Sequence, residues 1–371
     1  MKIKIYQDFN EELKSHWRKL EEESYLTPFQ SYSWLLNWYK TTGLPLHNID
    51  LFIVCLFNKS SVDLILPLGV KTVGKIRRLE WLGGLHSDYM MPVVRKESEF
   101  IFNDFESKWL KILSLLPPFD VLHLTKQVPR LGDRENPFVN LGPSTFIMNS
   151  YQAIFDGGWE EYKQKKIRKN VLADSKRQRK RLSKLGKLEF IISNNKEDRK
   201  KFTEEMFLQK RKGYQEMGVL DVLKPQEHQN LYINVPTDLG CTGKIHCSVL
   251  LLGKKVIASH WGILSKNTFY YLMPAYERGE WSKYSPGKLL LENLMIWCCK
   301  NNIETFDFTG GDETYKKIWA NNSFPLSEVM KSYTPKGYFY LRIYKFKSIL
   351  GRIPLIGKLL KFFKKSFFFN S

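Results

Sequence analysis

Cysteine is scarce in this sequence, and long apolar runs are missing from it. The five cysteines among 371 residues are an odd number and include no CxxC pair, a pattern typical of proteins of the reducing cytosol. Residues 1–13 contain no apolar stretch of signal-peptide length. Apolar runs such as 51–57 are of strand length, well short of the ~20 residues that a membrane-spanning helix needs. We therefore expect a cytoplasmic protein that does not span the bilayer.

Metal-binding motifs are also missing. The seven histidines and five cysteines show neither HExxH spacing nor paired CxxC spacing. The sequence therefore predicts chemistry without a metal ion.

Acidic residues are few where the basic ones gather. The formal net charge is +20, and two segments hold nearly all of it. Residues 161–187 carry twelve Lys or Arg against two acids, and residues 336–371 carry nine and no acid. The remainder is almost neutral, as on an ordinary enzyme surface. The charge therefore indicates two local binding surfaces and not a uniformly basic protein.

Apolar periodicity predicts a mixed α/β protein with two halves. The expected domains are 1–145 and 146–335, followed by a tail at 336–371, and a segment rich in Pro, Gly and Asn at 126–150 connects the halves. The main expected strands are 50–57, 62–72, 77–82, 120–125, 187–192, 246–252, 255–276 with a break near 265–267, and 305–308. The main expected helices are 97–116, 161–187, 196–217, 286–301 and 312–320.

A strand, a tight loop and a helix start follow one another near residue 285. Ser285 is placed to cap the helix, Pro286 suits its first position, and Gly287 lets a ligand approach the backbone. Lys283 and Lys288 add positive charge. A helix start of this kind favours a phosphate or pyrophosphate, although a simple turn and cap has the same sequence.

A polar cluster follows the next predicted strand. Asp307, Asp312, Tyr315 and Lys316 surround the glycine pair at 310–311. Polar groups at the carboxyl end of a strand often form ligand sites in α/β folds. The alternative is that Asp307 caps the turn while Tyr315 packs against the core.

Taken together, these motifs resemble a known family. The run 284–290, Asp307-Phe308 and the segment 311–316 are similar to the GNAT-type acetyltransferases of the CelD/BcsL-like family, from cellulose and exopolysaccharide biosynthesis. The basic helix and the segment around 29–38 fit the same family, so the resemblance covers roughly residues 25–330. One departure is visible, because relatives carry a histidine and a tryptophan near Gln209 and Gly213, and this chain has neither. That departure leaves the acceptor open.

The resemblance implies tandem GNAT-like domains, related also to the FemABX ligases that move amino acids from aminoacyl-tRNA onto peptidoglycan precursors. It implies direct transfer from acetyl-CoA or another acyl-CoA, with positioning and an oxyanion-binding amide supplying most of the catalysis. The expected cofactor-binding residues are Lys283, Tyr284, Ser285, Gly287 and Lys288. Tyr315 is the expected acid, and Asp307, Asp312 and His260 are the candidate bases. Asp88, Tyr271, Tyr276 and Lys316 are expected to contact substrate.

Three functions remain open from the sequence. The first is an acyl-CoA-dependent N- or O-acyltransferase that acts on a saccharide or lipid-linked precursor of the cell envelope or an exopolysaccharide. The second is a FemABX-like ligase that uses aminoacyl-tRNA, with the basic helix 161–187 contacting the tRNA backbone. The third is a noncatalytic RNA-binding or scaffold protein. The basic helix carries no RNP, zinc-finger or zipper pattern, and it also suits phosphorylated substrate or anionic lipid.

The tail at 336–371 combines aromatic, aliphatic and basic residues. From 355 to 369, lysines and apolar residues alternate at helical spacing. This pattern predicts a helix that lies on an anionic membrane surface at the inner face of the cytoplasmic membrane. Docking of the same helix on the protein's own core is the alternative.

Overall fold

The computed structural model describes residues 2–96 and 98–352 of the chain. In the first half the strands are β1 (Lys2–Tyr6), β2 (Asp50–Asn58), β3 (Ser61–Val73), β4 (Ile76–Trp81), β5 (Val93–Val94), β6 (Val121–Gln127), β7 (Arg130–Leu131) and β8 (Arg134–Glu135). The helices are α1 (Glu11–Glu22), α2 (Tyr32–Trp38), α3 (Leu44–His47), α4 (Glu99–Phe102) and α5 (Phe105–Leu115), with short turns η1 (Pro28–Gln30), η2 (Tyr39–Gly43), η3 (Gly84–His86) and η4 (Pro137–Asn140).

The second half continues the alternation. Its strands are β9 (Ser144–Ile154), β10 (Leu188–Ile192), β11 (Lys244–Leu252), β12 (Lys255–Ser265), β13 (Thr268–Tyr276), β14 (Thr305–Gly310) and β15 (Asn322–Ser332). Its helices are α6 (Gly158–Lys166), α7 (Lys169–Ser183), α8 (Lys196–Glu216), α9 (Gln226–Asn234), α10 (Pro286–Lys300), α11 (Thr314–Trp319) and α12 (Pro335–Arg352), with turns η5 (Gly240–Thr242) and η6 (Gly279–Tyr284).

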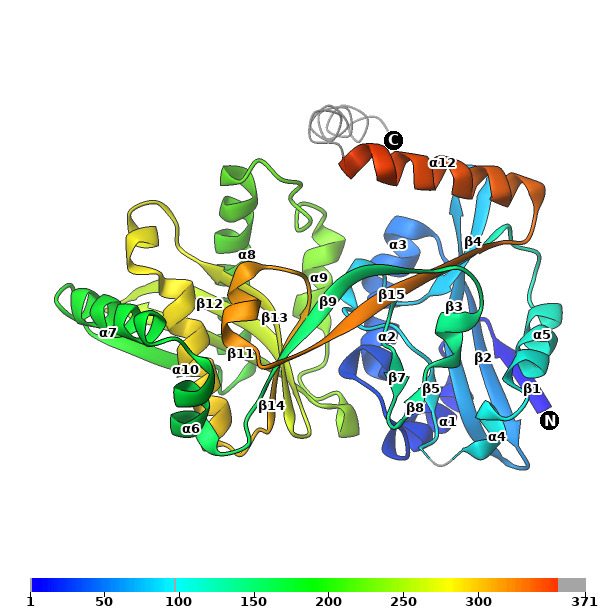
Figure 1. Cartoon of the computed structure of the whole chain (residues 1–371), viewed down its shortest axis with the longest axis horizontal. Helices are drawn as coiled ribbons and strands as arrows, with labels where there is room; N and C mark the ends of the chain where they lie inside the picture. The colour runs from blue at the N-terminus through cyan, green and yellow to red at the C-terminus, as the bar shows by residue number, and fades with distance from the viewer. Residues whose placement is uncertain (1, 97, 353–371) are drawn as a thin grey trace.

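One mixed sheet runs through the whole molecule (Figure 1). Its strand order is β1-β2-β3-β4-β6-β15-β9-β14-β13-β12-β11-β10, with β5 added beside β3. Each half contributes four antiparallel strands followed by a parallel pair, β4 with β6 and β13 with β14. The two halves therefore repeat one topology, which the sequence permitted and did not reveal. The expected mixed α/β fold is confirmed.

Two long strands at the centre of the sheet were not predicted. β9 pairs with β14, and β15 lies between β9 and β6, so the last strand of the chain completes the sheet of the first half. In Figure 1 the two strands cross the middle of the molecule side by side. The prediction of a connector at 126–150 is wrong from Ser144 onward. Both strands are only partly buried and Pro325 interrupts β15, so neither shows the apolar alternation that identifies a strand.

Two predicted helices are broken. The helix expected at 97–116 divides into α4 and α5, because Asp104 takes a left-handed backbone conformation with φ of 50°. The basic helix expected at 161–187 divides into α6 and α7 at residues 167–168, where Ile167 and Arg168 leave the helical conformation. Neither break has a proline or glycine to signal it in the sequence.

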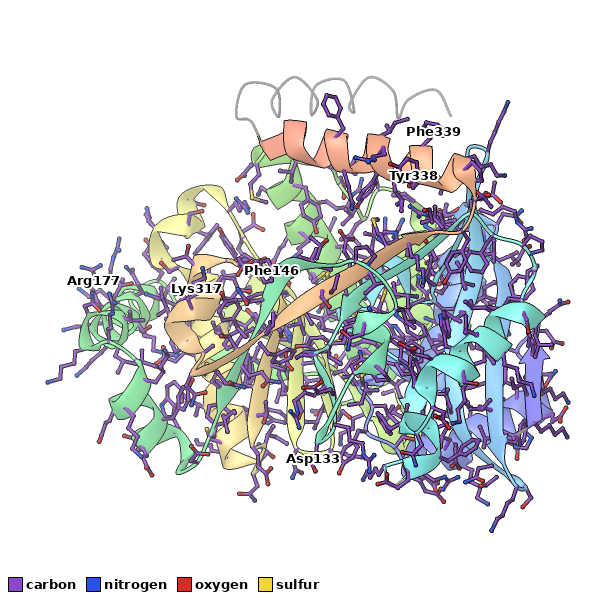
Figure 2. All side chains as sticks on the ribbon, turned by 45° about the vertical axis from the view of Figure 1, so that its right-hand side comes forward. Asp133, Phe146, Arg177, Lys317, Tyr338 and Phe339 are labelled. Carbon is purple, nitrogen blue, oxygen red and sulfur yellow. The ribbon has the colours of Figure 1, made fainter. Side chains whose placement is uncertain are left out.

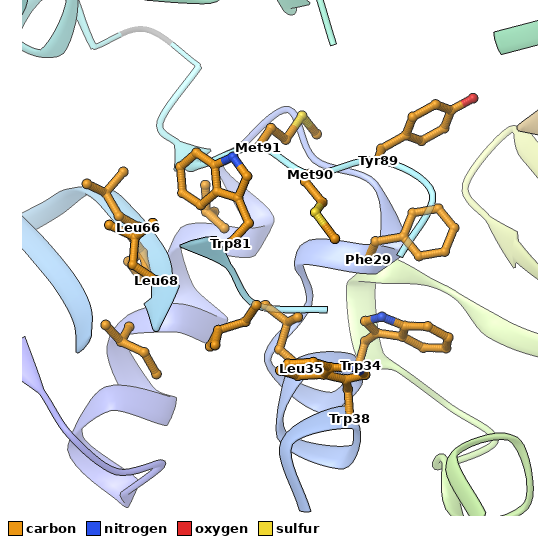
Figure 3. Packing of buried hydrophobic residues seen from close by; sticks show 14 of the residues in the cluster. Phe29, Trp34, Leu35, Trp38, Leu66, Leu68, Trp81, Tyr89, Met90 and Met91 are labelled. Atoms are coloured by element: carbon orange, nitrogen blue, oxygen red, sulfur yellow. The ribbon is translucent and has the colours of Figure 1, made fainter. Parts of the chain in front are cut away.

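The hydrophobic core crosses the boundary between the halves. One cluster of buried side chains joins the first half to α8, α9, β11 and β12, and the rings of Trp34 and Trp261 lie 6.3 Å apart. A second cluster lies under α10 and α6. α8 and α10 contact the same strands from opposite faces, since each contributes to a different cluster. Figure 3 shows the first cluster, where Phe29, Trp34 and Trp38 pack near the segment that carries Tyr89.

α12 packs along the edge of the first half. It contacts β15 and β4, and Leu341 is buried against Val121 and Met330. Arg78 donates a hydrogen bond to the Tyr340 hydroxyl at 3.1 Å. The beginning of the predicted tail thus docks on the protein's own core by one helix face. The remainder of the predicted amphipathic helix, at 355–369, lies outside the described residues. Within those residues, no helix is long and apolar enough to cross a bilayer.

Candidate active site

The parallel strands β13 and β14 separate after a short contact. Only three residue pairs join them, from Thr268–Thr305 to Tyr270–Asp307. Beyond this point β13 stays with β12, and β14 turns to β9. The register of β13 on β12 shifts between Tyr271 and Met273, which is a β-bulge. The separation leaves backbone groups of β13 facing a gap and not another strand.

A cavity of about 560 Å³ lies in this region. It is lined by residues of α7, β13, the start of α10 and α11, namely Asn170, Val171, Asp174, Tyr271, Pro274, Tyr276, Ser282, Ser285, Gly287, Lys288, Leu291, Tyr315, Ile318 and Trp319. We call it the donor pocket. Of the thirteen predicted site residues, Tyr271, Tyr276, Ser285, Gly287, Lys288 and Tyr315 line it.

The N-terminus of α10 opens into the donor pocket. Pro286 stands at the first helical position and Ser285 at the N-cap, as predicted, but the Ser285 side chain makes no capping hydrogen bond. Ser285 has a left-handed backbone with φ of 52°, and a capping hydroxyl needs an extended one. A Cβ atom at Gly287 would lie 3.0 Å from the Tyr276 ring. Glycine therefore lets the helix start approach β13 closely, and the positive end of the helix dipole faces the pocket.

The basic helix α7 lies across the start of α10. Lys288 forms an ion pair with Asp174, and this pair lowers the pKa of the Asp174 carboxyl. Arg181 stacks over the Tyr284 ring at 4.8 Å and donates a hydrogen bond to the Lys283 carbonyl at 3.3 Å. Lys283 and Tyr284 thus lie beside the pocket without lining it. The two elements together place basic groups where a phosphate would meet the helix start.

Tyr315 reaches the pocket from α11. Burial raises the pKa of its hydroxyl, so the group stays protonated at neutral pH. In the part of the chain that the structure describes, this hydroxyl has no hydrogen-bond partner. A protonated, unengaged hydroxyl is suited to donate a proton to a group in the pocket.

The three candidate bases lie outside the donor pocket. His260 is fully buried, stacks on Tyr271 with ring centroids 4.6 Å apart, and burial lowers its pKa well below the usual value. Its ring nitrogens have no hydrogen-bond partner among the described residues. Asp312 accepts hydrogen bonds from Asn149 at 3.1 Å and Tyr151 at 2.9 Å, and the bond from Asn149 lowers its pKa.

Asp307 joins the two halves of the molecule. Its buried carboxylate accepts hydrogen bonds from the Tyr89 hydroxyl at 2.7 Å, Gln152 Nε2 at 2.9 Å and Thr309 N at 2.7 Å. Tyr89 also hydrogen-bonds Ser150. Burial raises the pKa of Asp307 to about 6. Two of these donors come from other elements, Tyr89 in the first half and Gln152 on β9, so the carboxylate links the two halves.

Two pairs of opposite charge lie near the boundary between the halves. Lys316 is buried and donates a hydrogen bond to the Gly310 carbonyl at 2.6 Å, while its Nζ lies 3.0 Å from Glu313. Asp88, from the first half, lies 3.9 Å from Lys126 Nζ. Neither Asp88 nor Lys316 lines the donor pocket.

The sequence did not point to Lys210. This partly buried residue of α8 donates a hydrogen bond at 2.9 Å to the carbonyl of Pro274, a residue that lines the donor pocket. Burial lowers the pKa of its ammonium group to about 8, and Glu313 and Asp88 are close enough to oppose that shift. No sequence signal selected it, because α8 carries several other lysines and no motif singles out this one.

The departure at residues 209 and 213 has a structural explanation. Gln209 accepts a hydrogen bond from Ser259 at 2.7 Å and donates one to the Val256 carbonyl at 3.1 Å, so it is tied to β12. A Cβ at Gly213 would lie 2.9 Å from the guanidinium of Arg278. Arg278 also stacks over the Tyr276 ring at 5.2 Å. Glycine at 213 thus makes room for an arginine beside the pocket.

Metal ligands do not gather in this region. Across residues 2–96 and 98–352, no group of three or more His, Cys, Asp or Glu side chains could hold a metal ion.

Known proteins resemble this chain in one sequence segment and in overall fold. Residues 169–317 match a family described as an acetyltransferase (GNAT) domain. The fold is similar to the crystal structure of FemX, with 13% identity and a TM-score of 0.59 over 92% of this chain and 100% of that one. It is also similar to L-PGS from Bacillus licheniformis, with 11% identity and a TM-score of 0.51 over 94% and 99%.

A conserved protein of unknown function from Bacteroides thetaiotaomicron has the same degree of similarity, with 11% identity and a TM-score of 0.51 over 89% of this chain and 99% of that one. No curated protein matches the sequence. At these identities the solved structures share the fold alone.

The matched segment contains most of the donor pocket. It spans α7, β13, α10, β14 and the start of α11, which together form the separated strands and the helix start. The two-half architecture extends over nearly the whole of each similar structure, so the predicted α/β fold with two similar halves is shared with them. The chain is therefore an acyltransferase, and its residues 169–317 are similar to a GNAT acetyltransferase domain.

Proposed function

We propose that the protein transfers an acyl group from acyl-CoA to an amine or hydroxyl of a cell-envelope or exopolysaccharide precursor. The observation that carries the proposal is the donor pocket, which joins the gap between β13 and β14 to the N-terminus of α10. In this proposal 1–145 and 146–335 act as two GNAT-like domains, and the second holds the donor. Transfer is direct, without a covalent enzyme intermediate.

The pocket suits each part of the donor. The start of α10, with Gly287 and Lys288, would hold the pyrophosphate, because backbone amides and the helix dipole favour negative charge there. Lys283 and Tyr284 would add contacts at the rim. The acyl chain and thioester would enter the gap between β13 and β14, flanked by Tyr271 and Tyr276.

The chemistry needs a proton donor and a proton acceptor. The acceptor nitrogen or oxygen attacks the thioester carbonyl, a β13 amide that faces the gap stabilises the oxyanion, and the carbon–sulfur bond breaks. Tyr315 then protonates the departing thiolate. We assign the acceptor's proton to Lys210, whose amino group reaches the pocket wall at Pro274. Asp307, Asp312 and His260 lie outside the pocket and stay outside this proposal.

The acceptor would approach from the face opposite α10. Lys210 and Arg278 lie on that side, and Asp88 and Lys316 contribute charges from the boundary between the halves. Donor and acceptor thus meet at the gap from opposite faces of the sheet, as direct transfer requires. A saccharide or lipid-linked precursor is the acceptor class that the CelD/BcsL-like resemblance favours.

We place the protein at the inner face of the cytoplasmic membrane, where such precursors are assembled. Support comes from the nine basic and no acidic residues of 336–371.

An aminoacyl-tRNA donor is the second candidate. It is favoured by one observation, the row of exposed basic residues on α7 beside the donor pocket, because such a row suits a nucleic-acid backbone.

The donor is tested by calorimetry with acetyl-CoA and longer acyl-CoAs. We expect micromolar-range binding that Gly287→Asp weakens at least about tenfold, because a carboxylate would occupy the anion site. Gly287→Ala separates crowding of Tyr276 from charge and should retain more affinity than Gly287→Asp. Gly186→Asp is the control, since a side chain there meets only ordinary contacts. Absence of binding to every acyl-CoA, together with clear tRNA binding, would assign the chain to the ligase function.

A further inference from the structure

Large apolar side chains are exposed on two separate elements. On α12 they are Tyr338, Phe339, Ile343 and Phe346, which are 46%, 65%, 55% and 62% exposed. In the 217–222 loop after α8 they are Met217, Val219, Leu220 and Val222, which are 54%, 48%, 72% and 38% exposed. We call these eight residues the docking face. Isolated exposed apolar residues are ordinary, but two groups of four are not.

Both groups lie on one side of the molecule. In Figure 1, α12 and the loop that joins α8 to α9 are both at the upper edge, and Figure 2 shows Tyr338 and Phe339 at the same outer edge. The opposite face of α12, with Gly337 and Leu341, packs on β15 and β4. The exposed residues of α12 therefore point away from that core. The face therefore has two apolar projections from elements more than 100 residues apart in the chain.

The charge around the docking face is positive. The sequence of α12 holds five basic residues, Lys336, Arg342, Lys345, Lys347 and Arg352, and no acid, and residues 353–371 add four lysines and no acid. Arg342 donates its hydrogen bonds to the Tyr338 hydroxyl, not to a carboxylate. In the loop the one acid, Asp221, is paired with Arg211 at 2.8 Å. Glu216, which directly precedes the loop, lies 3.6 Å from Arg278.

We propose that the docking face is the surface by which the protein lies on an anionic lipid bilayer, with α12 and the 217–222 loop both inserted among the headgroups. Apolar side chains flanked by basic ones, on a helix whose described part is neither long nor apolar enough to span a bilayer, are the features of interfacial binding. Each basic residue near an anionic leaflet adds attraction that salt screens, while the apolar insertion resists salt. This adds a second contact, the loop, to the tail that the sequence indicated.

The position of the 217–222 loop also indicates where the acceptor side of the active site lies relative to the bilayer. Lys210 lies seven residues before Met217 on the same helical segment, about 10 Å along its axis. This consequence rests on the proposed function: the acceptor side of the active site would lie close to the bilayer, as a lipid-linked acceptor requires. The docking face itself does not depend on the acyl-transfer proposal.

The test is flotation of the full chain with vesicles of phosphatidylcholine alone or mixed with phosphatidylglycerol. We expect binding to the mixed vesicles only. The pairs Phe339→Ser with Ile343→Ser, and Val219→Ser with Leu220→Ser, should each weaken it about tenfold, and both pairs together about a hundredfold, because the sites are separate. Arg342→Gln with Lys345→Gln should reduce both the affinity and its dependence on salt. Leu110→Ser on α5, equally exposed, is the control and should change nothing.

Several results would overturn the proposal. Loop variants that bind like the unaltered protein would remove the loop from the surface, and equal losses with Leu110→Ser would make the effect nonspecific. A lower melting temperature in the α12 variants would mean that protein covers the face. A dimer in lipid-free sedimentation that dissociates in Phe339→Ser with Ile343→Ser would assign the face to a second copy. Acyl-CoA binding, measured on the same variants, reports on the donor site separately, so failure of either proposal is recognised by itself.

Discussion

Tyr315 is the residue most directly placed for chemistry. It lines the donor pocket, burial keeps its hydroxyl protonated, and no described group engages that hydroxyl. We expect Tyr315→Phe to lower kcat about 100-fold while the dissociation constant for acyl-CoA changes little, because the proton is needed only as charge develops on the leaving sulfur. Steady-state kinetics and calorimetry on one preparation measure the two quantities. Unchanged kcat would remove Tyr315 from the mechanism.

The proposed role of Lys210 as the base predicts how kcat/KM depends on pH. A base must be unprotonated to act, and burial lowers the pKa of this lysine to about 8. We therefore expect kcat/KM to rise with pH up to about 8 and to level off above it, since that is the range in which the neutral amine forms. Lys210→Met should abolish this limb and lower kcat/KM about 100-fold. Lys212→Met is the matched control. Lys212 lies two positions after Lys210 on the same helix, is exposed and forms an ion pair with Glu277. An unchanged pH profile in Lys210→Met would exclude it as the base.

At the scale of elements, substitutions on α7 can distinguish an acyl-CoA donor from an aminoacyl-tRNA donor. One of its faces lines the donor pocket through Asn170, Val171 and Asp174, and the rest is exposed and basic. Lys176, Lys180 and Lys184 lie one turn apart along the outer side, none of them in the pocket.

We expect the triple substitution of Lys176, Lys180 and Lys184 by glutamine to leave acyl-CoA affinity and turnover within about twofold, because a CoA molecule contacts the inner face. Binding of bulk tRNA should weaken. The slope of log affinity against log salt concentration should fall by about three, because each lost lysine–phosphate contact removes about one released counterion. Calorimetry with acyl-CoA and a salt titration of tRNA binding provide the measurements. A large loss of turnover with an acyl-CoA donor would show that α7 binds substrate by its outer side.

At the scale of the whole molecule, the two halves share a sheet and a core. β15 is inserted between β6 and β9, the first core cluster includes residues of both halves, and Tyr89 hydrogen-bonds Asp307 across the boundary. Two domains connected by a flexible linker would unfold separately, but these share the strands that hold them together.

We therefore expect a single cooperative unfolding transition. Five of the ten tryptophans lie in each half, so fluorescence reports on both, and its midpoint in denaturant should coincide with that of circular dichroism. Tyr89→Phe should lower the free energy of unfolding by about 1–3 kcal/mol, because a buried carboxylate loses one of its donors. Two separated transitions would mean that the shared strand does not couple the halves.

Local pattern was enough to determine the mixed α/β class, the strands and helices of strong periodicity, and the helix start at residues 285–288 beside the strand that ends near Asp307. These features depend on neighbours in the chain, where turn residues and apolar spacing act directly.

β9 and β15 were missed because partial burial in the middle of a sheet leaves no alternation, and their place depends on strands far away in sequence. Lys210 and Arg278 are ordinary basic residues until the fold brings α8 against β13. Asp307 appeared to be a catalytic candidate from its position after a strand, yet its role depends on Tyr89, 218 residues earlier. Burial, pKa and hydrogen-bond partners arise from contacts between distant segments, and only the tertiary structure decides them.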